Sequence, residues 1–162
     1  MAQVASAGAL LLMALRDLYD AEAALAERLP VVLAHASFRN LKQFIEADRE
    51  RSVRQHADLD RLTRALGGAP DGEPCVWMRA VLDDSDNDAA TIAAGPLRDI
   101  ALVGALRKGK QAERVSYETA LALAERLDLA DAAATLRTIR DEEQAADETL
   151  AALLVQLAGE IA

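Results

Sequence analysis

The segment 11-LLMALRDLYDAEAALAERLPVV-32 decides the fold of this chain. Its large apolar residues recur in alternating steps of four and three, which is the spacing that places side chains on one face of an α-helix. This face consists of Leu11, Leu15, Leu18, Glu22, Leu25, Leu29 and Val32. We therefore predict a long amphipathic helix whose buried face carries one carboxylate, Glu22, near its middle.

Three later segments repeat this pattern, each with an apolar face that polar residues interrupt near its middle. In the second predicted helix, leucines and isoleucine flank Asp48, Ser52 and Gln55, with Arg51 beside them. In the third, the interruption consists of Lys110, Glu113 and Tyr117. In the fourth it is Glu143, with Asp147 one turn further on. Interruptions at similar depth in four helices predict a belt of polar groups inside a bundle, flanked by Tyr19 and Tyr117.

The composition is typical of one all-helical domain spanning residues 1–162. The chain has 52% apolar residues, only four prolines and eight glycines, and 3% aromatic residues. Such a chain can fill one core of ordinary density and favours long helices over sheets. We expect no strand.

The charge and cysteine content limit the classes of partner and compartment. A formal net charge of −9 disfavours binding to nucleic acid or to anionic lipid. The single cysteine, Cys75, cannot form an internal disulfide, so a cytoplasmic location is expected. No apolar run is long enough to cross a membrane, and the apolar start, 1–15, is predicted to be the first turns of a helix rather than a signal peptide.

The breaks between the periodic segments predict the topology. The first helix should end near His35, after a kink at Pro30, and the second should run from Phe38 to the glycine and proline cluster at 67–72. Residues 73–95 are expected to form a long crossover with two short apolar pieces around an acidic, solvated turn at 83–88. Gly95-Pro96 should open the third helix, and a tight turn near Asp128 should join it to the fourth. Two helical hairpins joined by a long crossover form a ferritin-like four-helix bundle.

Carboxylates in a buried belt must be neutralised by protonation, by metal ions or by basic side chains. Di-iron and di-manganese bundles use metal ions, with Glu-x-x-His pairs on two of the helices. Neither His35 nor His56 has a glutamate three residues before it, so this pattern is missing from the sequence. Lys110 and Arg51 instead place two cations in the belt. We predict a buried network of salt bridges formed by Glu22, Arg51, Lys110, Glu113, Glu143 and Asp147, with Tyr19, Asp48, Gln55 and Tyr117 at its edges.

Three segments resemble the signatures of the YciE/YciF-type ferritin-like stress proteins. They are 16-RDLYDAE-22, 97-LRDIAL-102 and 141-DEEQAADETL-150, and the CVWM piece at 75–78 is also similar to the crossover of that family. The resemblance spans about residues 9 to 157. It implies a ferritin-like bundle that is usually dimeric, is associated with bacterial stress responses and is often assigned a di-metal site, for which Glu22, Glu113, Glu143 and Asp147 would be the carboxylates.

The sequence departs from that family pattern at three belt positions. Arg51 and Lys110 stand where the family tends to carry an acid, and Gln111 stands where a histidine is common. Opposite charge at two ligand positions should prevent an ordinary dinuclear centre. Our main expectation is a non-catalytic scaffold protein, a homodimer without a cofactor. The alternative is an iron- or manganese-dependent oxidoreductase or iron-handling protein that acts on peroxide, and for Glu22 and Glu143 salt bridging, metal ligation and protonation all stay open.

Overall fold

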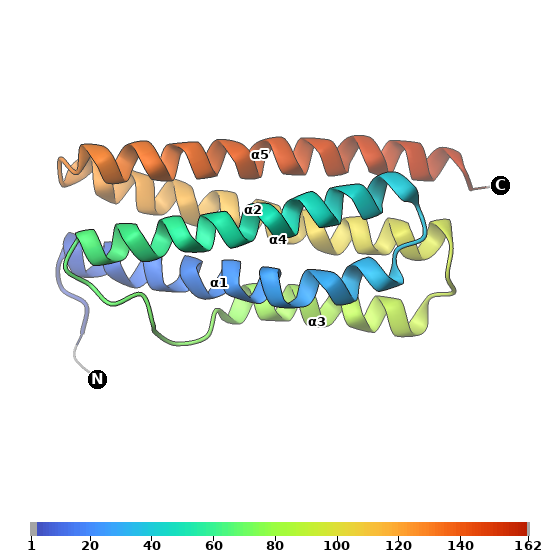
Figure 1. Cartoon of the computed structure of the whole chain (residues 1–162), viewed down its shortest axis with the longest axis horizontal. Helices are drawn as coiled ribbons and strands as arrows, with labels where there is room; N and C mark the ends of the chain where they lie inside the picture. Colours follow the sequence, from blue (N-terminus) through green and yellow to red (C-terminus); the bar gives the residue numbers. More distant parts are fainter. Residues whose placement is uncertain (1–2, 162) are drawn as a thin grey trace.

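The computed structural model describes residues 3–161, and in this range the chain forms five helices and no strand. They are α1 (Ala7–His35), α2 (Arg39–Ala65), α3 (Val76–Thr91), α4 (Pro96–Arg126) and α5 (Ala130–Gly159). The four long helices lie side by side along the molecule, and α3 packs against α1 and α4 (Figure 1). Within the hairpins α1 contacts α2 and α4 contacts α5, and α3 lies in the crossover between them. This arrangement confirms the predicted all-α bundle of two hairpins.

The helix boundaries follow the predicted breaks closely. Ser6 caps α1 by accepting a hydrogen bond from the Ala9 N–H at 3.2 Å. Gly95, with a φ of 126°, precedes α4, which begins at Pro96. Asp128 adopts a φ of 56° in the short turn between α4 and α5. The predicted start of the first helix at Met1 and Ala2 lies outside the described residues, and the helix begins at Ala7.

The prediction of an acidic turn at 83–88 is wrong, because α3 continues through this stretch as one helix. The buried residues of α3 share one face and are Met78, Leu82, Ser85 and Ala89. The acidic side chains find cationic partners on the neighbouring helices. Arg28 of α1 pairs with Asp83 at 2.6 Å and also with Asp86, and Lys108 of α4 pairs with Asp84 at 3.0 Å. Burial of this face, together with the ion pairs, favours a continuous helix over the turn that aspartate prefers in isolation.

The start of α3 is fixed to α1 by two aspartates. Asp17 accepts a hydrogen bond from the Trp77 indole N–H at 2.7 Å. Asp20 accepts one from the backbone N–H of Cys75 at 2.6 Å and pairs with Arg79 at 2.7 Å. Burial raises the pKa of the Cys75 thiol to about 12, so this cysteine is a packing residue rather than a reactive thiol. The crossover is therefore anchored at the point where it meets the bundle.

Asp99, in the first turn of α4, holds the connection between α1 and α2. Its two carboxylate oxygens accept hydrogen bonds from the backbone N–H groups of Ser37 and Phe38 at 2.9 and 2.8 Å. Asp99 is only 1% exposed. The two bonds therefore give this buried carboxylate its partners and also pair the backbone N–H groups that precede α2. The two hairpins are thereby joined at one end of the bundle.

Pro30 lies inside α1 and removes one backbone hydrogen bond, because proline has no N–H to donate to the carbonyl four residues earlier. That carbonyl belongs to Ala26. The structure shows Arg49 of α2 donating its Nε–H to the Ala26 oxygen at 3.1 Å. A side chain from the neighbouring helix thus replaces the missing donor, and α1 continues to His35.

The buried apolar residues divide into two clusters, one on each side of the bundle midpoint. One cluster contains Leu25, Leu29 and the residues of α2, α3, α4 and α5 that face them. The other contains Leu11, Leu15 and the facing residues of α2, α4 and α5. Trp77 packs against both clusters. The positions between them are polar, as the interrupted faces predict.

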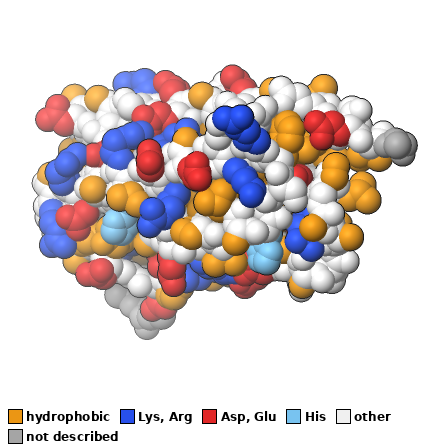
Figure 2. All heavy atoms as spheres, turned by 45° about the vertical axis from the view of Figure 1, so that its right-hand side comes forward, with side chains coloured by type: hydrophobic (Ala, Val, Ile, Leu, Met, Phe, Trp, Pro, Cys, Tyr) orange, Lys and Arg blue, Asp and Glu red, His pale blue; other side chains and the backbone are white. Residues whose placement is uncertain are grey.

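On the surface, Lys and Arg side chains are interspersed with Asp and Glu on the face that Figure 2 shows. None of the helices within residues 3–161 is both long enough and apolar enough to span a bilayer.

The contact between Arg49 and Ala26 gives the first testable prediction. Arg49→Ala should lower the free energy of unfolding by about 1 kcal/mol, because it leaves the Ala26 carbonyl without its donor. In a Pro30→Ala background the same change should cost less, because the substituted alanine supplies a backbone N–H to that carbonyl. Urea unfolding of the wild type, both single variants and the double variant measures the coupling.

Arg39→Ala is the matched control, because Arg39 is an exposed arginine of the same helix. Its cost should not depend on the residue at position 30. Equal costs of Arg49→Ala in the two backgrounds would show that Arg49 does not replace the donor lost at Pro30.

Candidate functional site

All four long helices contribute polar side chains to one buried group at the bundle midpoint, here called the polar cluster. Every member is at most 1% exposed. Its members are Glu22 of α1, Asp48, Ser52 and Gln55 of α2, Lys110, Glu113 and Tyr117 of α4, and Glu143 of α5. Each lies on the apolar face of its helix, so packing of the leucines on either side forces it inward.

Lys110 lies at the centre of the polar cluster. Its Nζ is 2.7 Å from Glu143 Oε2, 2.9 Å from Glu113 Oε2 and 3.1 Å from Asp48 Oδ1. All three contacts lie within ion-pair distance, and the one with Glu143 is also a hydrogen bond. An ammonium has three N–H donors, and here three carboxylates, one each from α2, α4 and α5, lie around it.

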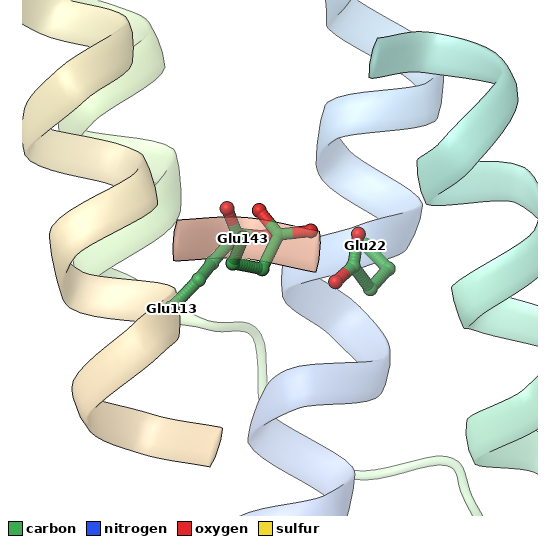
Figure 3. Close-up of side chains that lie close together, drawn as sticks. All are labelled: Glu22, Glu113 and Glu143. Atoms are coloured by element: carbon green, nitrogen blue, oxygen red, sulfur yellow. The ribbon is translucent and has the colours of Figure 1, made fainter. Parts of the chain in front are cut away.

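Glu22 approaches the same centre from α1. Tyr117 donates its O–H to Glu22 Oε1 at 2.6 Å. One carboxylate oxygen each from Glu22, Glu113 and Glu143 lies within 4.8 Å of the others, and the three side chains converge in Figure 3. Within the described residues, Glu22 Oε2 and Glu113 Oε1 have no hydrogen-bond partner. Some buried oxygens of the polar cluster are thus free to accept a further hydrogen bond or to bind a cation.

Gln55 and Arg51 connect the polar cluster to the surface between α2 and α5. The Gln55 amide donates to buried Glu143 at 2.8 Å and to half-buried Glu142 at 2.9 Å. Arg51 donates to Asp48 at 2.5 Å while its side chain keeps 23% exposure. The guanidinium thus adds positive charge from the edge of the polar cluster, beside Lys110.

Asp147 and Tyr19 lie apart from the group around Lys110. Asp147 faces Arg107, at 2.7 and 3.2 Å, and accepts a hydrogen bond from Gln111 at 2.6 Å. The hydrogen bond from Arg107 lowers the Asp147 pKa. Tyr19 stacks on His56 with ring centroids 4.0 Å apart. The expectation that Asp147 joins the central network is corrected, because a nearer arginine on the facing helix binds it.

Ser52 is buried on the interrupted face of α2, where the sequence places it. One residue with a role at the site, Arg107, was not anticipated from the sequence. Arg107 lies three residues before Lys110, one turn away on the same side of α4, which is the signal that could have suggested it as a partner of Asp147.

The carboxyl groups of the polar cluster do not share one protonation state. Burial raises the pKa of Glu22 to about 8, and the charge of Glu143 adds to this effect. Burial and the charge of Glu143 also raise the pKa of Glu113 well above its usual value. Burial alone would raise the pKa of Glu143 too, but the charge and hydrogen bond of Lys110 outweigh it and lower this pKa. At neutral pH, Glu22 therefore keeps its proton, burial favours the protonated form of Glu113, and Lys110 favours the ionised form of Glu143.

This distribution balances the charge of the site. Burial lowers the pKa of a lysine, but the charges of Asp48, Glu113 and Glu143 outweigh it and raise the pKa of Lys110 well above its usual value. Four acids face two cations, Lys110 and Arg51, so two protons make the polar cluster neutral. Glu143 pairs with Lys110, and Asp48 lies between Lys110 and Arg51, whose charges oppose the rise in the Asp48 pKa that burial causes.

The arrangement does not fit a dinuclear metal centre of the kind that the family resemblance implies. The Lys110 ammonium occupies the space among the carboxylates of α2, α4 and α5, at 2.7 to 3.1 Å from each. Asp147 is turned to Arg107, and no histidine belongs to the polar cluster in the described residues. A metal ion there would lie beside a buried cation at a few ångströms, which is strongly repulsive.

The raised pKa of Glu22 predicts that the free energy of unfolding falls as the pH rises through the neutral range. In the folded protein Glu22 holds its proton up to about pH 8, whereas the ordinary value in an unfolded chain is 4.5. The folded state binds more protons between these values. The contribution of Glu22 to the free energy of unfolding is therefore complete below pH 4.5. As the pH rises from there towards about 8, this contribution falls by about 1.4 kcal/mol per pH unit. Denaturant unfolding across this range measures the slope.

Glu22→Gln should flatten this dependence, because glutamine is neutral at every pH and keeps the shape of the protonated acid. The matched control is Glu46→Gln at an exposed position of α2, which should keep the wild-type slope. Parallel profiles for the wild type and Glu22→Gln would mean that Glu22 is ionised in the folded protein.

Comparison with known proteins gives a consistent set of relatives. Residues 6–162 match the family described as "Domain of unknown function (DUF892)". "Protein YciF" of Escherichia coli (strain K12) is 28% identical over 145 residues, which cover 87% of this chain and 86% of that protein. The crystal structure of the E. coli stress protein YciF superposes with a TM-score of 0.93 at 25% identity and covers 98% of this chain and 100% of that chain.

A second solved structure is similar over most of its length. It is YcfI, a putative structural protein from Rhodopseudomonas palustris, with a TM-score of 0.87 and 31% identity over 91% of this chain and 94% of that chain. The family match covers nearly the whole sequence, and the solved structures share the helical architecture, which is a ferritin-like fold. This chain belongs to the DUF892 family of YciF-like proteins.

Proposed function

We propose that this chain is a structural, non-catalytic stress-response protein of the cytoplasm, which acts as a helical scaffold and associates as a homodimer. In this proposal the belt of acids that ferritin-like bundles use for metal ions serves here as an internal ionic network. The protein then requires no cofactor and binds neither nucleic acid nor membranes.

The position of the Lys110 ammonium carries this proposal. It lies within 3.1 Å of three carboxylates from three helices and is 1% exposed. A tethered ammonium at this place supplies the positive charge that a metal ion would supply. It offers neither redox chemistry nor an open coordination position, which the metal-dependent reactions of this fold class need.

The descriptions of two relatives support a structural role. One is named a stress protein and the other a putative structural protein. These words describe those proteins, and the proposal extends them to this chain on the strength of the shared family. The net charge of −9 supports the absence of nucleic acid from the list of partners.

A second candidate function is handling of peroxide or iron with a bound iron or manganese ion. The convergence of Glu22, Glu113 and Glu143 within 4.8 Å favours it, since carboxylate oxygens bind such ions. Two of these acids also have oxygens without a hydrogen-bond partner in the described part of the chain. This function requires the ion to bind although Lys110 and Arg51 are close by.

The network predicts that Lys110→Ala destabilises the protein strongly. Removal of the ammonium leaves Glu143 and Asp48 buried without their central partner, and breaking a buried ion pair costs about 3–5 kcal/mol. Chemical denaturation at neutral pH, with helicity followed by circular dichroism, measures this change in the free energy of unfolding.

The matched control is Lys108→Ala, two residues earlier on the same helix. Lys108 is 65% exposed and pairs with exposed Asp84, so its loss should cost well under about 1 kcal/mol. A similarly small cost for Lys110→Ala would show that the ammonium does not hold the polar cluster together.

The two candidate functions differ in what the purified wild type does with metal. The structural role predicts substoichiometric iron and manganese by elemental analysis when the protein is prepared without chelators. It also predicts that added Fe²⁺ or Mn²⁺ gives no protein-dependent consumption of peroxide. Stoichiometric metal together with protein-dependent turnover of peroxide would establish the second function instead.

A further inference from the structure

The surroundings of the Lys110 ammonium have the chemistry of a cation site. Three carboxylate oxygens, from Asp48, Glu113 and Glu143, approach Nζ at 3.1, 2.9 and 2.7 Å. Oxygen atoms around Mn²⁺, Mg²⁺ or Ca²⁺ lie at about 2.0–2.6 Å. A contraction of these contacts by about half an ångström would therefore convert the ammonium cage into a coordination shell for a small divalent cation.

Further oxygens are available next to this cage. Glu22 Oε2, Asp48 Oδ2, Glu113 Oε1 and Ser52 Oγ are buried and have no hydrogen-bond partner among the described residues. The carboxylates of Glu22, Glu113 and Glu143 point toward one another in Figure 3. The available donors are thus oxygens without a histidine or cysteine, which suits hard cations such as Mn²⁺, Mg²⁺ and Ca²⁺.

We infer that the position of the Lys110 ammonium is a latent binding site for one hard divalent cation, and that the Lys110 side chain alone keeps the cation out. In the wild type the ammonium is attached to the backbone and cannot diffuse away. A metal ion would have to displace it into an apolar interior, where a lone charge is strongly unfavourable. Removal of this one side chain opens the site.

The latent site holds one ion rather than two. Asp147, which the family pattern would assign to metal, is held by Arg107 and Gln111 outside the cage. Arg51 pairs with Asp48 from the other side and limits the negative charge there. One divalent cation replaces the charge of Lys110 and needs the release of only one proton from the neighbouring acids to keep the site neutral.

This inference rests on the proposed function, because both assign Lys110 the place of the cation. The inference goes further because it names the class of ion, a hard divalent cation, and the residue, Lys110, whose side chain determines whether an ammonium or a metal ion fills the site. The two can fail separately. A wild type that turns over peroxide with bound metal contradicts the proposed function, whereas a metal-free Lys110 variant contradicts only the latent site.

The experiment compares Lys110→Glu and Lys110→Met with the wild type and with Lys108→Glu. Glutamate adds a further carboxylate, and methionine keeps the length of the side chain without its charge. All four proteins are stripped with a chelator and then titrated with MnCl₂. The melting temperature is recorded by calorimetry, and bound manganese is counted by elemental analysis after gel filtration.

We expect Lys110→Glu to bind one manganese per chain. Its melting temperature should rise by about 5–10 °C when Mn²⁺ is about 100-fold above its dissociation constant. Lys110→Met should show the same stoichiometry with weaker binding. The wild type and Lys108→Glu should retain no stoichiometric manganese and keep their melting temperatures.

Three outcomes would overturn the inference. The first is stoichiometric Mn²⁺ in the wild type, because Lys110 would then not exclude the ion. The second is a folded Lys110→Glu protein that binds no manganese. The third is failure of both Lys110 variants to fold even with Mn²⁺ present, because an ion that fills the site must restore the fold that the ammonium supports.

Discussion

A charged amine can remain inside an apolar helical bundle only while carboxylates from the surrounding helices contact it, and this constraint determines the middle of the molecule. Lys110 meets it through Asp48, Glu113 and Glu143. Three of the four long helices must therefore keep their relative height. A slide of α4 by one turn would move Nζ by about 5.4 Å and break the contacts with α2 and α5. The apolar clusters alone would specify this height less sharply, because cores filled with similar hydrophobic side chains lose uniqueness before they lose stability.

Helical periodicity predicts which residues face inward, and the polar residues on the interrupted faces are indeed buried. Glu22, Lys110, Glu113 and Glu143 each replace an apolar residue on a regular face, so their burial follows from local sequence alone. The partner that each side chain chooses does not follow from periodicity. Asp147 lies on an inward face as well, but Arg107 of the facing helix binds it, and that choice depends on the rotation of α4 relative to α5.

Tertiary contacts also explain the error in the crossover. Aspartate and asparagine favour turns in isolation, which is why the stretch at 83–88 reads as a break. In the folded chain one face of α3 is buried against the bundle, and Arg28 and Lys108 pair with acids on its exposed side, so a continuous helix is favoured. Asp99 illustrates the same limit, because its role depends on the N–H groups of Ser37 and Phe38, about sixty residues away in sequence. Contacts of this range become visible only when the hairpins are placed together.

A tethered ammonium and a metal ion differ in what they require from the cell. In bundles that fold around a metal, the free energy of binding is part of the free energy of folding, so stability depends on supply of the ion. In this chain the cation belongs to the polypeptide, and the site is filled as soon as α2, α4 and α5 come together. Two acids complete the neutralisation with protons, which are available at any metal concentration. On the proposed function, the exchange gives up metal chemistry and makes the fold independent of metal supply, which suits a structural protein that must persist while metal availability changes.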